Sequence, residues 1–128
     1  KEIQIVQHHC IDKEGLYHLI VWYKAPYIAS ICNCSNSYCF VYRGAQIAGF
    51  EKTLIKGEYV AKVNQRLCEG CKNCLTRCPF SAVSFNVDDG RAFIDINRCF
   101  GCGLCENGCE NKAITLVDRK LTPAKNLW

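Results

Sequence analysis

One cysteine pattern, present twice, constrains the fold of this 128-residue chain more than any other feature. Each run has the spacing C-x-x-C-x-x-C-x-x-x-C, and each cysteine of the first run has a counterpart 31 residues later. The runs are Cys68, Cys71, Cys74 and Cys78, followed by Cys99, Cys102, Cys105 and Cys109. Thiolates at this spacing bind cubane iron–sulfur clusters, and in two-cluster proteins the fourth cysteine of each run ligates the other run's cluster. The runs therefore predict two interlocked four-cysteine sites that carry single electrons.

A disulfide scaffold is the main alternative for a short chain with 12 cysteines. Disulfides, however, have no reason to impose the same three-residue spacing twice at one fixed offset. We therefore expect free thiolates. Because thiolates and cubanes need reducing conditions, we expect a cytoplasmic location, in a cell that avoids oxygen.

The 31-residue repeat extends beyond the cysteines. It pairs Ala61 with Ala92, Val63 with Ile94, Gly70 with Gly101, Ala82 with Ala113 and Val83 with Ile114. This pattern indicates a duplicated half-domain whose two halves share one core. The two glycines precede the second cysteine of each run, where we expect the backbone to turn tightly and approach a cluster.

Short apolar runs and turn residues predict the secondary structure of the repeat. The expected elements are strands at 59–63, 82–85, 92–96 and 113–116, a short helix within 75–80, and a turn at 88–90. Such an order places each cysteine run between two strands.

Residues 59–117 resemble a bacterial-type ferredoxin with two [4Fe-4S] clusters. The resemblance implies an α+β fold, a ferredoxin-like βαββαβ dicluster module with pseudo-two-fold symmetry. It implies that one cluster is held by Cys68, Cys71, Cys74 and Cys109, and the other by Cys99, Cys102, Cys105 and Cys78. Pro79 matches the usual proline after the fourth cysteine, whereas Glu110 departs from it in the second run. We therefore expect two inequivalent clusters.

The chain is expected to have three parts: a small mixed N-terminal extension over 1–58, the dicluster domain over 59–117, and a C-terminal tail over 118–128 that is exposed from Thr122 onward. The elements expected in the extension are a strand at 2–7, an amphipathic helix at 13–24 stopped by Pro26, an extended segment at 27–31, and a loop or weak helix at 43–50. Because the chain contains no methionine, we expect it to be a fragment or a processed form.

The extension contains a second group of cysteines, Cys32, Cys34 and Cys39, with Cys10 upstream. Together with His8, His9 and His18 they could supply four ligands for zinc or for a third iron–sulfur cluster. Their spacing matches no strong motif, and free cysteines are also common buried hydrophobes. A metal site and structural thiols both remain open at this point.

Charge and motifs limit the range of partners. The formal net charge is +4, but two oxidised cubanes, each about −2 with its four thiolates, bring the total to about zero. A near-neutral protein is more typical of a docked subunit than of a freely diffusing acidic ferredoxin. No basic block favours nucleic acid, the apolar stretch 16–34 is too interrupted to cross a membrane, and no catalytic or nucleotide motif occurs.

We therefore expect electron transfer through two low-potential clusters, in a small subunit or domain docked on a larger anaerobic oxidoreductase. The partner is a redox protein; the chain itself is an electron carrier rather than a catalyst and has no small-molecule substrate of its own. The alternatives are a free-standing ferredoxin, a structural or sensory iron–sulfur protein, and a protein that is itself catalytic, with its substrate chemistry at the N-terminal cysteine region.

Overall fold

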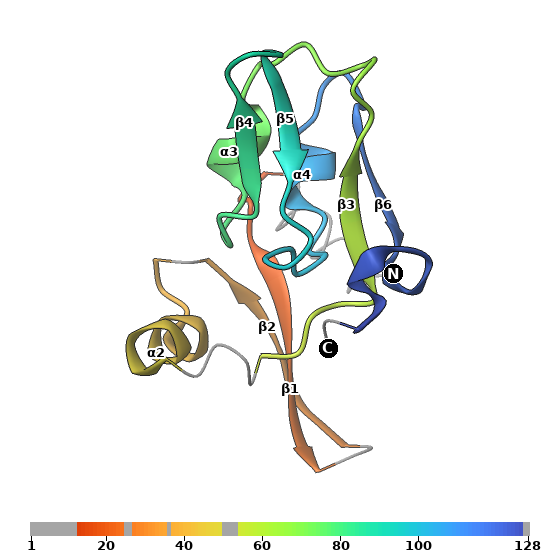
Figure 1. Ribbon diagram of the computed structural model, residues 1–128. Coiled ribbons are helices and arrows are strands. Elements are labelled where there is room, and N and C mark those ends of the chain that lie inside the picture. The colour runs from red at the N-terminus through yellow and green to blue at the C-terminus, as the bar shows by residue number, and fades with distance from the viewer. Residues whose placement is uncertain (1–12, 25–26, 36, 50–53, 127–128) are drawn as a thin grey trace. The chain divides into compact units, whose positions relative to one another are not determined.

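The computed structural model describes residues 13–24, 27–35, 37–49 and 54–126 (Figure 1). The chain divides into two compact units, Lys1–Leu54 and Ile55–Trp128. Each unit is described by itself. Among the described residues, no helix has the length and apolar character that crossing a membrane requires.

The second unit holds both cysteine runs. Its elements are β3 (Tyr59–Val63), α3 (Asn73–Arg77), β4 (Val83–Asn86), β5 (Arg91–Ile94), α4 (Leu104–Asn107), β6 (Ile114–Asp118) and two 3-10 turns, η2 (Arg119–Leu121) and η3 (Pro123–Asn126). This is a small mixed α/β arrangement, compatible with a ferredoxin-like module. The four strands lie at the positions expected from the sequence, to within two residues at each end.

Two antiparallel strand pairs form the frame of this unit. β3 pairs with β6, from Tyr59 opposite Asp118 to Val63 opposite Ile114. β4 pairs with β5, from Val83 opposite Ile94 to Asn86 opposite Arg91, with the predicted turn between them. β3 also contacts β5, α3 contacts α4 and β4, and α4 contacts β6 (Figure 1). The first and last strands therefore close the unit, with both cysteine loops inside it.

The core of the second unit is built from small apolar side chains and from cysteines. Its buried members are Val60, Ala61, Cys74, Ala82, Val83, Ala92, Cys99, Cys105 and Ile114. Buried alanines in or next to all four strands, Ala61, Ala82, Ala92 and Ala113, keep the strands apolar without filling the interior. Space therefore remains next to the cysteines.

Helix α3 begins and ends earlier than the predicted span of 75–80. It runs from Asn73 to Arg77, and Cys78 already has an extended backbone with φ −82° and ψ 106°. A residue that precedes proline is disfavoured in the helical region. Pro79 therefore ends the helix and turns Cys78 out of it.

The end of the chain differs from the exposed tail that the sequence suggested. Arg119 and Ala124 are both 0 % exposed, in η2 and η3. The Asp118 side chain accepts a hydrogen bond from the Lys120 N–H at 2.8 Å, and Thr122 Oγ1 donates to the Arg119 carbonyl at 2.8 Å. These two bonds fold the segment back, so the prediction of full exposure is wrong at Ala124.

The first unit contains a hairpin and one helix. β1 (Tyr17–Lys24) pairs antiparallel with β2 (Tyr27–Cys34), and α2 spans Phe40–Ala48. The predicted helix at 13–24 is therefore wrong. Gly15 has φ +65°, which no helix interior allows, and the following residues are β-branched and aromatic types that favour strands.

Two other predictions for the first unit agree with the structure. The extended segment at 27–31 is confirmed as part of β2, and the segment at 43–50 is largely helical as part of α2. The helix begins after Cys39, whose Sγ accepts a hydrogen bond from the Tyr42 N–H at 3.3 Å, and it ends at Gly49 in the left-handed conformation. The strand expected at 2–7 lies outside the described residues.

Candidate metal centre

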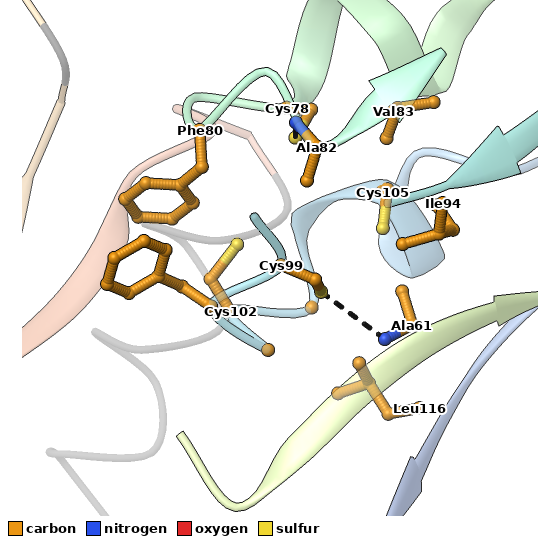
Figure 2. A pocket seen from close by; sticks show the side chains of 13 residues that line it. Ala61, Cys78, Phe80, Ala82, Val83, Ile94, Cys99, Cys102, Cys105 and Leu116 are labelled. Atoms are coloured by element: carbon orange, nitrogen blue, oxygen red, sulfur yellow. Dashed lines mark hydrogen bonds between the residues drawn. The ribbon is translucent and has the colours of Figure 1, made fainter. Parts of the chain in front are cut away.

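Two cavities lie inside the second unit, one beside each of two sets of four cysteines. Cavity 1 is lined by residues of both cysteine runs. Its walls include Cys78, Cys99, Cys102 and Cys105, and Figure 2 shows these four side chains around one space with Ala61 and Ala82. Three of the cysteines come from the second run and one from the first.

Cavity 2 is the counterpart of cavity 1. Its walls include Cys68, Cys71, Cys74 and Cys109, together with Ala92 and Ala113. Here three cysteines come from the first run and one from the second. The fold thus brings the last cysteine of each run beside the first three cysteines of the other run.

Short helices and the turns after them explain this exchange. Cys74 lies in α3 and Cys105 in α4, so each helix carries the third cysteine of its run. The chain then leaves the helix before the fourth cysteine, which is Cys78 or Cys109. Since α3 and α4 pack against each other, a residue that follows one helix reaches the cavity beside the other.

Backbone N–H groups point at several of these sulfur atoms. Ala82 N–H donates to Cys78 Sγ and Ala113 N–H donates to Cys109 Sγ, both at 3.3 Å. Ala61 N–H donates to Cys99 Sγ at 3.5 Å, the dashed line in Figure 2. Such bonds stabilise negative charge on sulfur and raise the reduction potential of a bound cluster.

Gly70 and Gly101 have φ +73° and +77°, which confirms the tight turns expected before the second cysteine of each run. A Cβ on Gly101 would lie 2.1 Å from the Tyr59 carbonyl oxygen, and one on Gly70 would lie 2.2 Å from the Gly90 carbonyl oxygen. Both cysteine loops therefore lie directly on the backbone of a neighbouring segment. Only glycine satisfies both the conformation and this approach.

Burial makes ionisation of the bare thiols costly. It raises the pKa of Cys105 to about 12 and that of Cys102 to about 11, and it also raises the pKa of Cys74. A metal centre reverses this preference because coordination deprotonates a thiol outright. The two cavities therefore suit a cationic group that binds thiolates.

The geometry of the donors distinguishes a single-ion site from a cluster site. Among the described residues, no group of three or more Cys, His, Asp or Glu side chains is close enough to hold one metal ion. A tetrahedral zinc ion needs sulfurs about 3.8 Å apart, given Zn–S bonds of about 2.3 Å. A cubane needs a wider set because its four cysteines bind four different irons. Four cysteines line each cavity, which is the number that a cubane requires.

The cysteines of the first unit lie on its hairpin and at the start of its helix. Cys32 and Cys34 lie on β2, and Cys39 caps α2. Burial raises the pKa of Cys34 to about 12, whereas hydrogen bonds from Tyr42 N–H, Tyr17 and Cys34 outweigh burial and lower the pKa of Cys39. Cys10, His8 and His9 lie outside the described residues, so the predicted third site stays a prediction.

Two features near cavity 1 were not predicted from the sequence. Phe80 and Phe100 both line it and stack on each other, with ring centroids 4.4 Å apart and planes inclined by 27°. The buried Arg119 donates a hydrogen bond to the Cys99 carbonyl at 2.8 Å. Nothing local marks Arg119, whose side-chain partners lie 20 to 62 residues away.

Comparison with known proteins agrees with this geometry. The sequence model of the 4Fe-4S dicluster domain matches residues 61–110. The chain is 36% identical over 53 residues to a ferredoxin-type protein, NapF, of Haemophilus influenzae, which covers 39% of this chain and 30% of that protein. It is 43% identical over 51 residues to the respiratory nitrate reductase 2 beta chain of Escherichia coli, covering 38% and 10%.

A further relative is a short protein. A probable ferredoxin of Methanosarcina thermophila is 56% identical over 36 residues, which cover 28% of this chain and 60% of that protein. The chain therefore spans less than two thirds of the length of each of these relatives, and all three matches cover less than half of the chain. Residues 61–110, which the sequence model of the dicluster domain matches, contain all eight cysteines of the two runs. Residues 61–110 match the 4Fe-4S dicluster domain, which is consistent with an iron–sulfur module of the ferredoxin type.

Proposed function

We propose that this protein transfers electrons through two [4Fe-4S] clusters, as a small subunit or domain docked on a larger redox enzyme. The observation that carries the proposal is the composition of the two cavities, each with three cysteines of one run and the fourth of the other. In this assignment Cys99, Cys102, Cys105 and Cys78 hold the cluster of cavity 1. Cys68, Cys71, Cys74 and Cys109 hold the cluster of cavity 2.

We also propose that the two halves are related by a pseudo-two-fold axis. Matched hydrogen bonds at the 31-residue offset support it. Asn64 N–H donates to the Ala113 carbonyl at 2.7 Å, and Asp95 N–H donates to the Ala82 carbonyl at 2.7 Å. The hydrogen bonds from Ala82 N–H to Cys78 Sγ and from Ala113 N–H to Cys109 Sγ match at the same offset. Duplicated halves with exchanged fourth ligands place two clusters within one small core.

Each bound cluster supplies a centre that takes up and releases one electron without breaking bonds. The protein supplies the rest. Its buried alanines leave room beside the sulfurs, its N–H groups donate to them, and Phe80 with Phe100 shields one side of cavity 1. Burial and thiolate charge favour the oxidised form, so we expect low potentials. The same chemistry favours a reducing, cytoplasmic and oxygen-poor setting.

A docked role is favoured by charge and by the kind of relative. With both clusters bound, the formal net charge of +4 falls to about zero, so long-range steering to many partners is weak. One relative bears the name of a reductase beta chain. The partner we propose is therefore a redox protein held by contact rather than met by diffusion. Elution of the loaded chain as a monomer that exchanges electrons rapidly with unrelated reductases would favour a free-standing ferredoxin instead.

Paired cysteine substitutions test the ligand assignment. Cys78→Ala with Cys102→Ala removes two ligands of the same cavity, and we expect about four irons and one intact cluster to remain. Cys102→Ala with Cys109→Ala also removes two cysteines, both of one run, and we expect both clusters to be lost. Iron and sulfide analysis with electron paramagnetic resonance of the reduced protein gives the count.

The opposite result would contradict the exchange. If the same-run pair keeps one cluster and the same-cavity pair loses both, each run holds its own cluster. If the unmodified chain assembles with iron and sulfide but its clusters never change oxidation state under a strong reductant, a structural or sensory role replaces electron transfer.

A further inference from the structure

Arg119 is the one charged side chain that is completely buried among the described residues. Its Nε donates to the Gly57 carbonyl at 2.9 Å, and its Nη2 donates to the carbonyls of Tyr59 at 2.9 Å and Cys99 at 2.8 Å. The buried Nη1 has no hydrogen-bond partner within the described part of the chain. A guanidinium is thus enclosed in the second unit with one of its nitrogens unpaired.

The partners of Arg119 do not neutralise its charge. All three acceptors are neutral peptide carbonyls. Burying a cation costs several kcal/mol unless an anion or a metal centre offsets it. A [4Fe-4S] cluster with four thiolates carries about −2 when oxidised and one more negative charge when reduced. The buried cation therefore points to an anionic group nearby.

Arg119 lies directly behind the wall of cavity 1. Cys99, whose carbonyl it binds, lines that cavity, and the Cys99 sulfur accepts the Ala61 N–H. Tyr59, which it also binds, begins β3, the strand that carries Ala61. One guanidinium thus fastens the peptide of Cys99 to the strand whose N–H reaches the Cys99 sulfur.

The second cavity has no equivalent cation at the matching position. The residue 31 positions before Arg119 is Asp88, which is exposed in the turn after β4 and whose N–H donates to Asn86 Oδ1 at 3.0 Å. The cation that lines cavity 2 is Lys72, and its side chain is exposed, with Nζ 4.6 Å from the centre of the Phe85 ring. An exposed charge is screened by water, whereas a buried one is not.

Other charges lie near the cysteines of cavity 1. Arg77 and Arg98 directly precede Cys78 and Cys99, and neither arginine is fully buried. Lys56 and Glu106 act in opposite directions. Lys56 donates to the Asn97 carbonyl and approaches the Phe100 ring, 5.7 Å from its centre. Glu106 follows Cys105 in α4 and its Oε1 accepts the Leu116 N–H at 3.0 Å. Neither is fully buried, so Arg119 is the fixed charge that water screens least.

We propose that Arg119 is a positioning residue that also acts as a fixed positive charge for the cluster of cavity 1, raising the reduction potential of that cluster and not of the other. A nearby cation stabilises the form with more negative charge, which is the reduced form, so it favours uptake of the electron. The residue would thereby separate the potentials of two clusters that have the same ligands. This inference rests on the electron-transfer function proposed above.

The test measures both potentials in the full chain after Arg119→Met, with Lys120→Met as the matched control. Lys120 is the neighbouring cation and its side chain is exposed, so the control removes the same charge from the surface. Potentiometric titration followed by electron paramagnetic resonance reports each cluster. Cys74→Ala with Cys109→Ala leaves cavity 1 alone, and Cys78→Ala with Cys102→Ala leaves cavity 2 alone, which assigns the signals.

We expect Arg119→Met to lower the equilibrium constant for reducing the cavity 1 cluster at least tenfold, or about 59 mV for one electron. The cavity 2 cluster and the Lys120→Met protein should change much less. Arg119→Lys keeps the charge but not the planar fork, so we expect it to retain most of the potential while losing iron faster to a chelator. If Arg119 acted only in folding, Arg119→Lys would not keep the reduction potential while it loses iron faster.

Other outcomes overturn the inference. These are an unchanged potential in Arg119→Met, equal shifts of both clusters, or an equal shift in Lys120→Met. If Arg119→Met does not assemble, Arg119→Gln provides a second neutral side chain for the same measurement, and loss of the cavity 1 cluster in all three variants would show a structural role only. Failure of the unmodified chain to take up any cluster would instead refute the proposed function, and the inference with it.

Discussion

At the residue scale, Gly101 and Gly90 share a left-handed backbone but differ in their surroundings. Their φ angles are +77° and +64°. A Cβ on Gly101 would lie 2.1 Å from the Tyr59 carbonyl oxygen, whereas a Cβ on Gly90 would have no atom within 4 Å. Conformational strain is therefore common to both sites, and the backbone clash occurs at Gly101. Comparing Gly90 with Gly101 therefore separates two reasons for a glycine in a loop, namely the left-handed backbone and the close approach of another segment.

We expect Gly90→Ala to destabilise the loaded protein by about 1–2 kcal/mol, the cost of the left-handed conformation. Gly101→Ala should cost clearly more because the Tyr59 carbonyl, which also accepts from Arg119, must move. Thermal loss of the visible absorbance of the clusters measures both variants. Equal midpoints for the two alanine variants would mean that the approach to Tyr59 imposes no constraint.

The sequence was informative about single residues where chemistry depends on residue type and local spacing. The eight cysteines and the two positive-φ glycines before them could be identified in this way. Arg119 could not, because its partners Gly57 and Tyr59 lie 62 and 60 residues away. No local pattern shows which cation in a chain with 16 lysines and arginines is the buried one.

At the scale of elements, the loop after α3 and the loop before α4 each place an aromatic ring at cavity 1. Phe80 is buried and follows the fourth cysteine of the first run, and Phe100 follows the first cysteine of the second. Their rings stack with centroids 4.4 Å apart. This stack joins two loops that the sequence separates by 20 residues, and it covers one side of the cavity.

We expect Phe80→Ala to make the cavity 1 cluster several-fold more sensitive to air, because it removes a stacked ring from the cavity wall. Truncating a buried phenylalanine typically costs about 3–5 kcal/mol. Phe93→Ala is the control, since Phe93 lies half-exposed on β5 and outside the lining of cavity 1. The rate of bleaching in air gives the comparison, and equal rates for the two variants would contradict a shielding role.

Element type was predictable in the second unit and less so in the first. The four strands of the second unit are bounded by turns and cysteine loops, so their limits could be read from composition. In the first unit, the segment 13–24 has apolar residues at spacings that suit a helix, yet Tyr17–Lys24 is a strand. Its pairing with Tyr27–Cys34 decides the outcome, since short apolar runs are ambiguous until a partner is known.

At the scale of the whole molecule, the two compact units separate the two groups of cysteines. The eight cysteines of the runs lie in Ile55–Trp128, and Cys32, Cys34 and Cys39 lie in Lys1–Leu54. We propose that residues 55–128 carry the electron-transfer role by themselves. Arg119 and Ala124 belong to this part, so a boundary at 117 would remove buried residues from it.

We expect residues 55–128 expressed alone to bind about eight irons, as two cubanes require. The full chain should bind the same number if the N-terminal cysteines are structural thiols, and about twelve if they hold a third cubane. Zinc analysis of the same samples shows whether the N-terminal cysteines bind zinc instead. Cys32→Ser with Cys34→Ser and Cys39→Ser in the full chain is the control, because it should remove only the additional metal. Fewer than about eight irons in residues 55–128 would contradict the proposed boundary.

The sequence alone determined the kind of cofactor, the eight cysteines that suit it, and the duplicated strand pattern around them. These depend on side-chain chemistry and on spacings of a few residues, which folding does not alter. Only the tertiary structure decided how Arg119 is enclosed, which rings cover cavity 1, and that Tyr17–Lys24 is a strand. Each of these depends on contacts between distant segments, and such contacts exist only once the strands have paired and the interior has closed.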